Sequence, residues 1–505
     1  YHGGDGLFVG HRYGVVQRKD KETGEIRYEW DRKSGENATG FPAQLEKYLN
    51  GARIGGKDSA TANGYREQMA LLEDQFNKWI KTHDRYDELV AKYNDVFNSN
   101  IPYEHSGDPL GLKGLSGKRQ PFDYQNSEVR RLSEDGRGIL GFGTGLGKTT
   151  TALALEAFNY ENGRSTRTAY VVPKSVLENW YYEAKEFLSE EAFSNYLFVG
   201  LDVLMDGDQI RQVPVLDENG KPVLGTDGTP VMRDALKLAD EATITARMNA
   251  IPHSNYRAVV FTKEQYARIP LRDDTVDEHA QDMLYDFVAA GRVASAMNSD
   301  SHRKEAARRR VLSEYSDTGT EKAEKYPYFE DMGFDSVIAD EGHNYRNSYK
   351  NGREASQLAY LPTSAVAQSA RDMAIKNAYL MKKNGGRGPV LLTATPVVNT
   401  PIDAYNMLSH VLPKEYWQKM GIYGPDDFVK FFGKTRLETV QKISGEVEEK
   451  MALVGFENLD ALRGIFHRWT TLKTAEDVKD TVEIPELDEH QQLSLIHISE
   501  PTRHA

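Results

Sequence analysis

From about residue 120 onward, short apolar runs alternate with longer amphipathic stretches. The apolar runs are at 139–142, 169–172, 196–200, 258–261, 336–339 and 390–393. Runs of this length without polar alternation are typical of strands buried on both faces. Because helix-length segments separate them, the pattern predicts an α/β domain with a mainly parallel sheet. Several runs end directly in polar motifs, so we expect one site at the carboxyl edge of the sheet.

Two long segments interrupt this alternation, within insertions at about 205–250 and 270–330. Residues 213–234 contain two turn signals, Asn219-Gly220 and Asp227-Gly228, which predict a protruding β-ribbon. Residues 270–330 are helical in pattern and charged, with a basic cluster at 303–310. That cluster is either a solvated helix face or a contact to backbone phosphates.

The residues before the alternating region have two different patterns. Residues 1–62 are polar, with a hairpin predicted around Thr23-Gly24. From Tyr65, large side chains recur every three or four residues: Met69, Leu72, Phe76, Trp79, His83, Tyr86, Val90, Tyr93 and Phe97. This spacing predicts one face of a long helix or helical hairpin packed in a core, with His83 as a packing or rim residue.

Composition narrows the class of protein. The chain has 505 residues, a net charge of −13 and no cysteine. Such a charge argues against a protein that coats nucleic acid through general basicity, although a local basic groove remains compatible. The absence of cysteine excludes disulfides and thiolate metal sites, and favours the cytoplasm. No apolar run approaches the length of a membrane span, so we expect no membrane contact.

Both ends of the sequence indicate a piece of a longer protein. The chain does not begin with Met. Residues 493–503 read LSLIHISEPTR and resemble a translated sequencing adapter from metagenomic libraries. We therefore expect native sequence to end near Gln492, and treat 493–505 as an artefact of assembly.

The strongest chemical signal is the loop GTGLGKT, which follows the apolar run at 139–142. Glycines allow backbone N–H groups to face phosphate oxygens, and the helix that begins here directs its positive end at the same anion. Lys148 is placed to reach the β- and γ-phosphates, and the Thr149 hydroxyl to hold Mg²⁺. Phe142 occupies the position of the first glycine in the strict pattern, so an ordinary glycine turn is the alternative for the loop alone.

A second motif, Asp340-Glu341-Gly342-His343, follows the run at 336–339. An acidic residue at such a strand end typically holds the Mg²⁺ that bridges the phosphates, and its neighbour positions the attacking water. An exposed pair of carboxylates would be unremarkable by itself. Its pairing with the glycine loop points to nucleotide chemistry.

Six motifs in this order resemble superfamily-two helicases, and within them the SWI/SNF-type DNA translocases. They read PFDYQNSEVRRL, GTGLGKT, VVPKSVLENWYYEAKEF, FTKEQY, FDSVIADEGHNYRN and LLTATPVVNTPIDAYNML. The resemblance implies a RecA-like P-loop lobe with ATP and Mg²⁺ as cofactors and duplex DNA as partner. Movement along duplex DNA, strand separation (including the motor subunit of a restriction complex) and a nucleotide-gated docking platform without motor activity remain alternatives.

The resemblance also implies a role for individual residues. The nucleotide would be bound by Gln125, Gly143, Thr144, Gly145, Leu146, Gly147, Lys148 and Thr149. Asp340 and Thr149 would hold the metal, and Glu341 would activate water together with Asp340 and Lys148 as the catalytic set. His343 would connect the nucleotide to the nucleic-acid groove through Thr393 and Thr395. Pro173, Lys174, Ser175 and Thr262 would lie against one DNA strand, whereas Trp180 would pack within the lobe.

The chain departs from the family pattern at three places. Phe142-Gly143-Thr144 replaces an acidic stretch, Gly342 replaces the usual alanine, and residues 261–263 match the threonine-tyrosine element weakly. The last departure weakens the assignment of DNA contacts.

The organisation implied is a polar N-terminal part at 1–62, a helical region at 63–118 and a RecA-like lobe at 119–412. Residues 413–492 would form a helical linker toward a second RecA-like lobe whose motifs the chain lacks. Hydrolysis in this superfamily needs an arginine from that lobe, so the chain alone is expected to turn ATP over negligibly. The segment at 76–102 resembles large phage and mobile-element proteins that combine a methylase region with a helicase.

Overall fold

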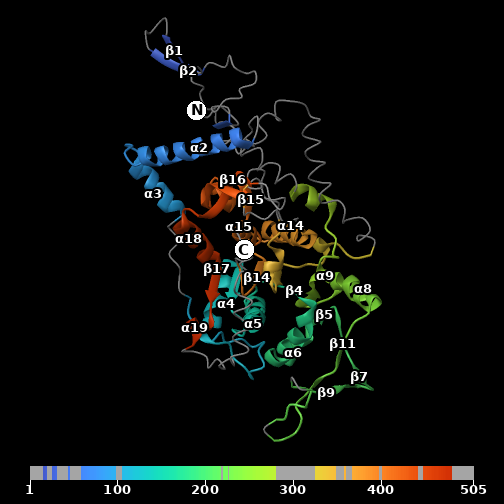
Figure 1. Ribbon diagram of the computed structural model, residues 1–505. Coiled ribbons are helices and arrows are strands. Elements are labelled where there is room, and N and C mark those ends of the chain that lie inside the picture. Colours follow the sequence, from blue (N-terminus) through green and yellow to red (C-terminus); the bar gives the residue numbers. More distant parts are fainter. Residues whose placement is uncertain are drawn as a thin grey trace.

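The computed structural model describes twelve segments of the chain (Figure 1). They are 15–19, 26–30, 44–45, 59–97, 105–217, 220–225, 227–279, 325–348, 358–359, 367–396, 401–441 and 447–479. The basic cluster at 303–310 and the adapter-like residues 493–505 lie outside them. No helix within these segments has the length and apolar character needed to cross a membrane.

Seven strands of the described residues form one sheet, in the order β17-β3-β14-β13-β4-β12-β5. All neighbouring strands in it are parallel. The strands are β3 (Gly138–Phe142), β4 (Thr168–Val172), β5 (Tyr196–Phe198), β12 (Ala258–Thr262), β13 (Ser336–Ala339), β14 (Pro389–Leu392) and β17 (Thr470–Lys473). The predicted α/β class with a mainly parallel sheet is confirmed, and every apolar run named above contributes a strand.

Helices cover both faces of this sheet. Successive strand residues point to opposite sides, and because the central strands are mainly apolar, both faces present side chains that must be buried. Leu140, Tyr170 and Val172 pack into the core on one face, and Ile139 and Val171 into the core on the other. The first face is covered by α4 (Asp123–Asp135), α5 (Lys148–Glu161), α6 (Leu177–Phe187) and α7 (Glu190–Ser194). The second is covered by α8 (Glu241–Ala250), α14 (Gln368–Lys383), α15 (Pro401–Ser409), α16 (Lys414–Lys419), α17 (Pro425–Phe432) and α18 (Leu459–Trp469).

The range 413–492 differs from the predicted helical linker. It contains an antiparallel hairpin, β15 (Gly433–Gln441) and β16 (Val447–Phe456), and its strand β17 joins the edge of the main sheet beside β3. A short helix, α19 (Ala475–Val478), follows. The sequence signal was weak because β17 is short and carries polar residues at an edge, where one side of the strand has no neighbour. Gly141 makes room for it, since a Cβ there would lie 2.5 Å from Leu472.

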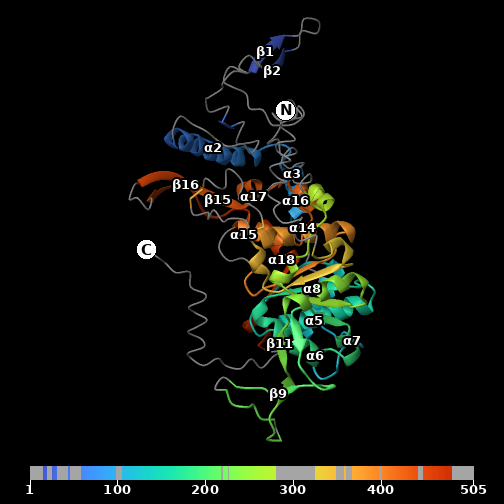
Figure 2. The same ribbon diagram turned by 90° about the vertical axis from the view of Figure 1, so that its right-hand side faces the viewer.

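The region before residue 100 contains the two expected elements. Strands β1 (Val15–Lys19) and β2 (Ile26–Trp30) form the predicted antiparallel hairpin. Helices α2 (Ser59–Ile80) and α3 (Tyr86–Phe97) follow one another along the chain; α2 lies beside β16 (Figure 2), and α3 contacts α18.

The stripe along α2 does not form a continuous core, so that prediction is wrong. Met69 is buried at 1% exposure, but Leu72, Phe76 and Trp79 are 39%, 55% and 53% exposed. His83 is partly buried against the Trp79 ring, at 4.7 Å between centroids, as a rim residue would be. Helical spacing defines which side chains share a face, but it does not specify what covers that face.

The predicted β-ribbon is confirmed and projects from the lobe at the lower end of Figure 1. Strand β9 (Gln212–Pro214) pairs with β10 (Met232–Asp234), and single bridges continue the pairing toward the tip. Two further pairs, β6 (Leu201–Val203) with β11 (Leu236–Leu238) and β7 (Met205–Asp206) with β8 (Gln209–Ile210), form its base.

Candidate functional site

The motif residues meet at the carboxyl edge of the sheet. In the parallel ladder, Val171 of β4 pairs with Ala339 of β13, and Val172 pairs with Thr262 of β12. The segments that leave β3, β4, β12, β13 and β14 therefore emerge side by side. This is the edge at which open α/β sheets bind their ligands.

The glycine loop adopts the geometry of a phosphate cradle. Gly145 and Gly147 have φ angles of +81° and +76°, which residues other than glycine rarely adopt. Helix α5 begins at Lys148, so its free N–H groups and its dipole face the loop. The Lys148 ammonium donates to the carbonyl of Phe142 at 3.2 Å, across the loop. Phe142, at the position of the first glycine of the strict pattern, is the last residue of β3 and is buried.

Gln125 lies directly against this loop. Its Nε2 donates to the carbonyl of Leu146 at 3.0 Å, and its Oε1 accepts from the backbone of Phe122 at 3.0 Å. The Tyr124 hydroxyl donates to the same Leu146 carbonyl at 3.0 Å. A Cβ at Gly147 would lie 2.3 Å from the Gln125 amide, so this glycine is required by packing as well as by its φ angle. The glutamine thus braces the loop, and its role toward adenine stays a prediction.

Asp340 is held by two donors at the end of β13. The indole Nε1 of Trp180 donates to its Oδ2 at 3.0 Å, and the backbone N–H of Glu341 donates to its Oδ1 at 2.9 Å. Burial raises the pKa of Asp340, while the Trp180 hydrogen bond and the nearby Lys148 charge oppose that shift. Trp180 is buried in the lobe, as expected, but the sequence did not reveal its bond to Asp340.

Glu341 is in a strained conformation next to its partner histidine. Its φ and ψ angles are 50° and 48°, which is uncommon for a residue with a side chain. Its carboxylate lies 3.2 Å from Nδ1 of His343, and this hydrogen bond lowers the pKa of Glu341. The adjacent Gly342 has no room for the family's usual alanine, because a Cβ would lie 2.9 Å from the Leu391 Cβ.

His343 is in hydrogen-bond contact with the segment after β14, as predicted. Its Nδ1 lies 3.1 Å from the hydroxyl of Thr393. The backbone N–H of Thr395 donates to that same hydroxyl at 3.1 Å. Thr395 is therefore connected to His343 through Thr393.

The residues present fit a magnesium ion shared with a nucleotide. Among the described residues, no group of three or more His, Asp or Glu side chains is placed to hold a metal by itself. Mg²⁺ is commonly bound through one or two protein ligands, with phosphate oxygens and waters as the remainder. Thr149 at the start of α5 and Asp340 after β13 are the residues that would hold this ion.

The predicted DNA-contact residues divide into two groups. Lys174 and Ser175 are exposed in the short helix η2 (Lys174–Val176), and Pro173 is partly exposed before it. Thr262 is only 4% exposed, and its hydroxyl accepts from the backbone N–H of Gln265 at 3.2 Å to cap α9 (Lys263–Tyr266). Its side chain is committed to the fold, and this disfavours a direct contact with a DNA strand.

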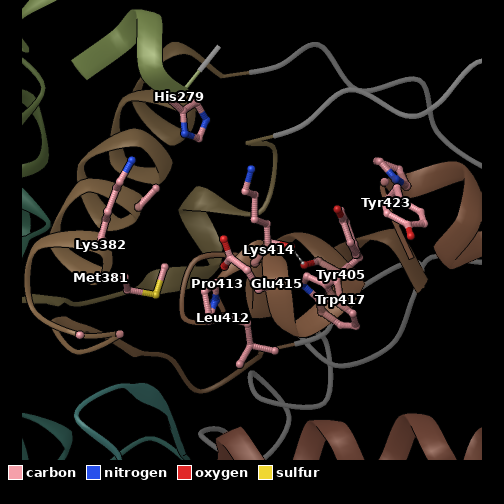
Figure 3. Close-up of a pocket in the computed structure, with 16 residues that line it drawn as sticks. His279, Met381, Lys382, Tyr405, Leu412, Pro413, Lys414, Glu415, Trp417 and Tyr423 are labelled. Carbon is pink, nitrogen blue, oxygen red and sulfur yellow. Dashed lines mark hydrogen bonds between the residues drawn. The ribbon is translucent and has the colours of Figure 1, made fainter. Parts of the chain in front are cut away.

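A separate cavity of about 570 Å³ lies near the C-terminal end of α14 (Figure 3). Its aromatic lining comes from Tyr405, Trp417 and Tyr423, and Lys382 and Lys414 also line it. Tyr405 belongs to the motif at 391–408, but none of the predicted nucleotide, metal or DNA-contact residues lines this cavity.

Two ranges of the chain match known protein families, and together they contain the motif residues. Residues 72–214 match the family described as SNF2-related domain, and residues 237–474 match the family described as probable helicase domain. The first range contains the glutamine motif, the glycine loop and residues 173–175. The second contains the Asp340 motif and the segment after β14.

Among solved structures, the chain is similar to the SWI2/SNF2 ATPase core of Sulfolobus solfataricus in complex with dsDNA. The identity is 13% and the TM-score 0.36, over 74% of this chain and 48% of that chain. The chain thus spans about half the length of that ATPase core. Over the two family ranges, the chain is similar to SNF2-type helicases of superfamily two.

Proposed function

We propose that this chain contains the first lobe of an ATP-dependent DNA motor of the SNF2 type. The observation that supports this best is the convergence at one sheet edge of the glycine loop, Asp340, Glu341 and the His343–Thr393 contact. Any one of these features by itself would also be compatible with a protein of another class. Together they form the nucleotide half of such a motor, in two ranges that match SNF2-related and helicase families.

In this proposal, the loop and the N-terminus of α5 bind the phosphates of ATP, and Lys148 reaches the β- and γ-phosphates. Bound Mg²⁺ would neutralise the charge that develops on these phosphates, with Thr149 and Asp340 as its protein ligands. Glu341 orients the attacking water. Its lowered pKa keeps the carboxylate ionised at neutral pH, so that it can accept a hydrogen bond from that water.

Communication with DNA would pass through the contact between His343 and Thr393. Thr393 follows β14 and is itself bonded to Thr395, so the two threonines and His343 connect the nucleotide edge with a second surface segment. The exposed Lys174 and Ser175 are the candidates for contact with DNA phosphates. Movement along duplex DNA without strand separation is the mode we favour, from the SWI/SNF-type motifs.

The described residues provide one wall of the nucleotide site. In this superfamily, an arginine from a second lobe stabilises the transition state, and such an arginine contributes about 10³- to 10⁵-fold in rate. We therefore propose that the chain binds Mg-ATP but hydrolyses it slowly by itself. The likeness of residues 76–102 to phage methylase–helicase proteins would place the whole protein among those mobile-element motors.

Calorimetric titration of the chain with ATP and Mg²⁺ tests the binding step. We expect binding, and a loss of about 10- to 100-fold in affinity for Lys148→Ala, since a charged hydrogen-bond donor to phosphate is removed. Lys113→Ala, a lysine away from the loop, is the matched control. Equal affinities for the wild type and both variants would contradict the proposal.

Phosphate release in the presence of duplex DNA tests the catalytic step. We expect turnover below about 1 s⁻¹, the low end of ordinary enzymes. Faster turnover would show that the chain needs no second wall. For the whole motor, displacement of a third strand from a triplex without unwinding of a duplex would distinguish translocation from strand separation.

A further inference from the structure

The indole of Trp180 connects the start of α6 with the proposed metal ligand. Trp180 is 2% exposed, and its Nε1 donates to Asp340 Oδ2 at 3.0 Å. The other Asp340 oxygen accepts from the backbone N–H of Glu341 at 2.9 Å. Each carboxylate oxygen has two lone pairs, so one on each remains available for a metal or its water. The two donors therefore fix the direction in which the free lone pairs point.

The indole ring is itself held in place by packing. It contacts the ring of Tyr170 on β4, at 5.2 Å between centroids. The Tyr170 hydroxyl donates to the carbonyl of Ala152 in α5, at 3.1 Å. The Trp180 indole thus packs against β4, the strand next to β13, and Tyr170 links it in turn to α5, the helix that follows the glycine loop. A carboxylate on a free rotamer would have none of this support.

Other tryptophans show that such a bond is not required for burial. Trp417 is 3% exposed, and its Nε1 has no hydrogen-bond partner in the described structure. Its ring packs between Tyr405 and Phe428 on the opposite face of the sheet. Burial alone therefore does not explain why the Trp180 nitrogen faces Asp340.

We propose that Trp180 is a positioning residue for the metal site, which holds Asp340 in the orientation needed to bind Mg²⁺ with the nucleotide. This inference rests on the proposed function. Residues that hydrogen-bond to a metal ligand typically change metal affinity about 10- to 100-fold when the bond is removed. The bond from Trp180 acts on Asp340 and not on the glycine loop, so its loss should affect only the metal-dependent part of binding.

The test compares ATP affinity with saturating Mg²⁺ and with EDTA, in the wild type, Trp180→Phe and the control Trp417→Phe. A Mg²⁺ titration at fixed ATP accompanies each. We expect Trp180→Phe to raise the Mg²⁺ concentration at half-saturation about 10- to 100-fold, and to leave ATP binding in EDTA unchanged. Trp417→Phe, which also removes an indole from the core, should change neither quantity.

A second replacement separates the hydrogen bond from the packing. Site-specific incorporation of benzothienylalanine at 180 replaces the indole N–H with sulfur and keeps the shape of the ring. It should reproduce the Mg²⁺ effect even if the phenylalanine variant folds poorly. A normal Mg²⁺ dependence in this variant would overturn the positioning role, as would an equal loss of ATP binding with and without metal.

These outcomes distinguish the inference from the function on which it rests. A wild-type chain that binds ATP with normal Mg²⁺ dependence, combined with normal behaviour of the benzothienylalanine variant, overturns the inference alone. A wild-type chain with no Mg²⁺-dependent binding overturns the proposed function and the positioning role together.

Discussion

The carboxyl edge of the sheet and helix α2 both present regularly placed side chains, but they differ in what holds those side chains in place. At the sheet edge, Asp340 and His343 follow a strand end, and each is hydrogen-bonded to another segment, Asp340 to Trp180 and His343 to Thr393. Along α2, Met69 is buried, while Phe76 and Trp79 are more than half exposed. A strand end positions a residue through the backbone ladder, whereas a helix face needs a separate partner.

The largest expected effect separates the two kinds of position within α2. Met69→Ala should reduce the free energy of unfolding by about 2–5 kcal/mol, because it removes a buried side chain and leaves a cavity. Trp79→Ala should cost less than about 1 kcal/mol, since half of that side chain is already in water. Urea unfolding of both variants is the measurement. A Trp79 cost as large as that of Met69 would show that the stripe is covered after all.

The next effect concerns a buried support of the sheet edge. His410 is fully buried, its Nε2 lies 2.9 Å from the Tyr345 carbonyl, and burial lowers its pKa from 6.5 to about 4. Between pH 6.5 and about pH 4, this histidine is therefore protonated in the unfolded chain but not in the folded chain. Stability from this residue is complete above pH 6.5 and falls as the pH drops to about 4, by on the order of 3 kcal/mol.

Unfolding free energies of the wild type and His410→Gln, measured from pH 7.5 to 4, check this dependence. The variant should lose the part of the decline that belongs to His410, although carboxylates still contribute their own. His253, an exposed residue at the end of η3 (Ile251–His253), provides the control variant His253→Gln. Identical pH profiles for the wild type and His410→Gln would contradict the assignment.

A smaller effect tests how tightly the sheet edge is packed. Gly342→Ala places a Cβ within 2.9 Å of the Leu391 Cβ, so β14 and the segment after β13 must move apart. We expect a cost of about 1–3 kcal/mol in unfolding free energy, as for other overpacked sites. Thermal unfolding measures it. Gly455→Ala, where a Cβ has no neighbour within 4 Å, is the matched control on β16 and should be tolerated.

The smallest expected effect compares exposed lysines of the two regions. Lys174→Ala at the sheet edge should weaken duplex DNA binding by about 1 kcal/mol or less and reduce the salt slope of binding by about 1. Lys81→Ala, between α2 and α3, should change neither. Fluorescence anisotropy at several salt concentrations gives both quantities. Equal salt slopes for the wild type, Lys174→Ala and Lys81→Ala would show that Lys174 does not contact DNA.

Most of the sheet could be predicted from local sequence, because its central strands are buried on both faces and read as uninterrupted apolar runs. The glycine loop and the Asp340 motif can also be recognised in the sequence, since their chemistry needs fixed residue types at strand ends. Strand β17 was missed, because a short polar strand at a sheet edge has no pattern of its own. A weak motif match predicts a DNA contact for Thr262, whereas its hydroxyl caps a helix in the structure.

The α/β class, the order of the motifs and the residue types at the carboxyl edge of the sheet follow from the amino-acid sequence. Those properties depend on backbone geometry and on spacing along the chain, which a single sequence contains. Only the tertiary structure decided that Trp180 bonds Asp340, 160 positions away in the chain, and that Gln125 braces the carbonyl of Leu146. It also decided that the α2 stripe is mostly exposed. These outcomes depend on which distant segments meet, because burial and hydrogen bonding are properties of neighbours in space.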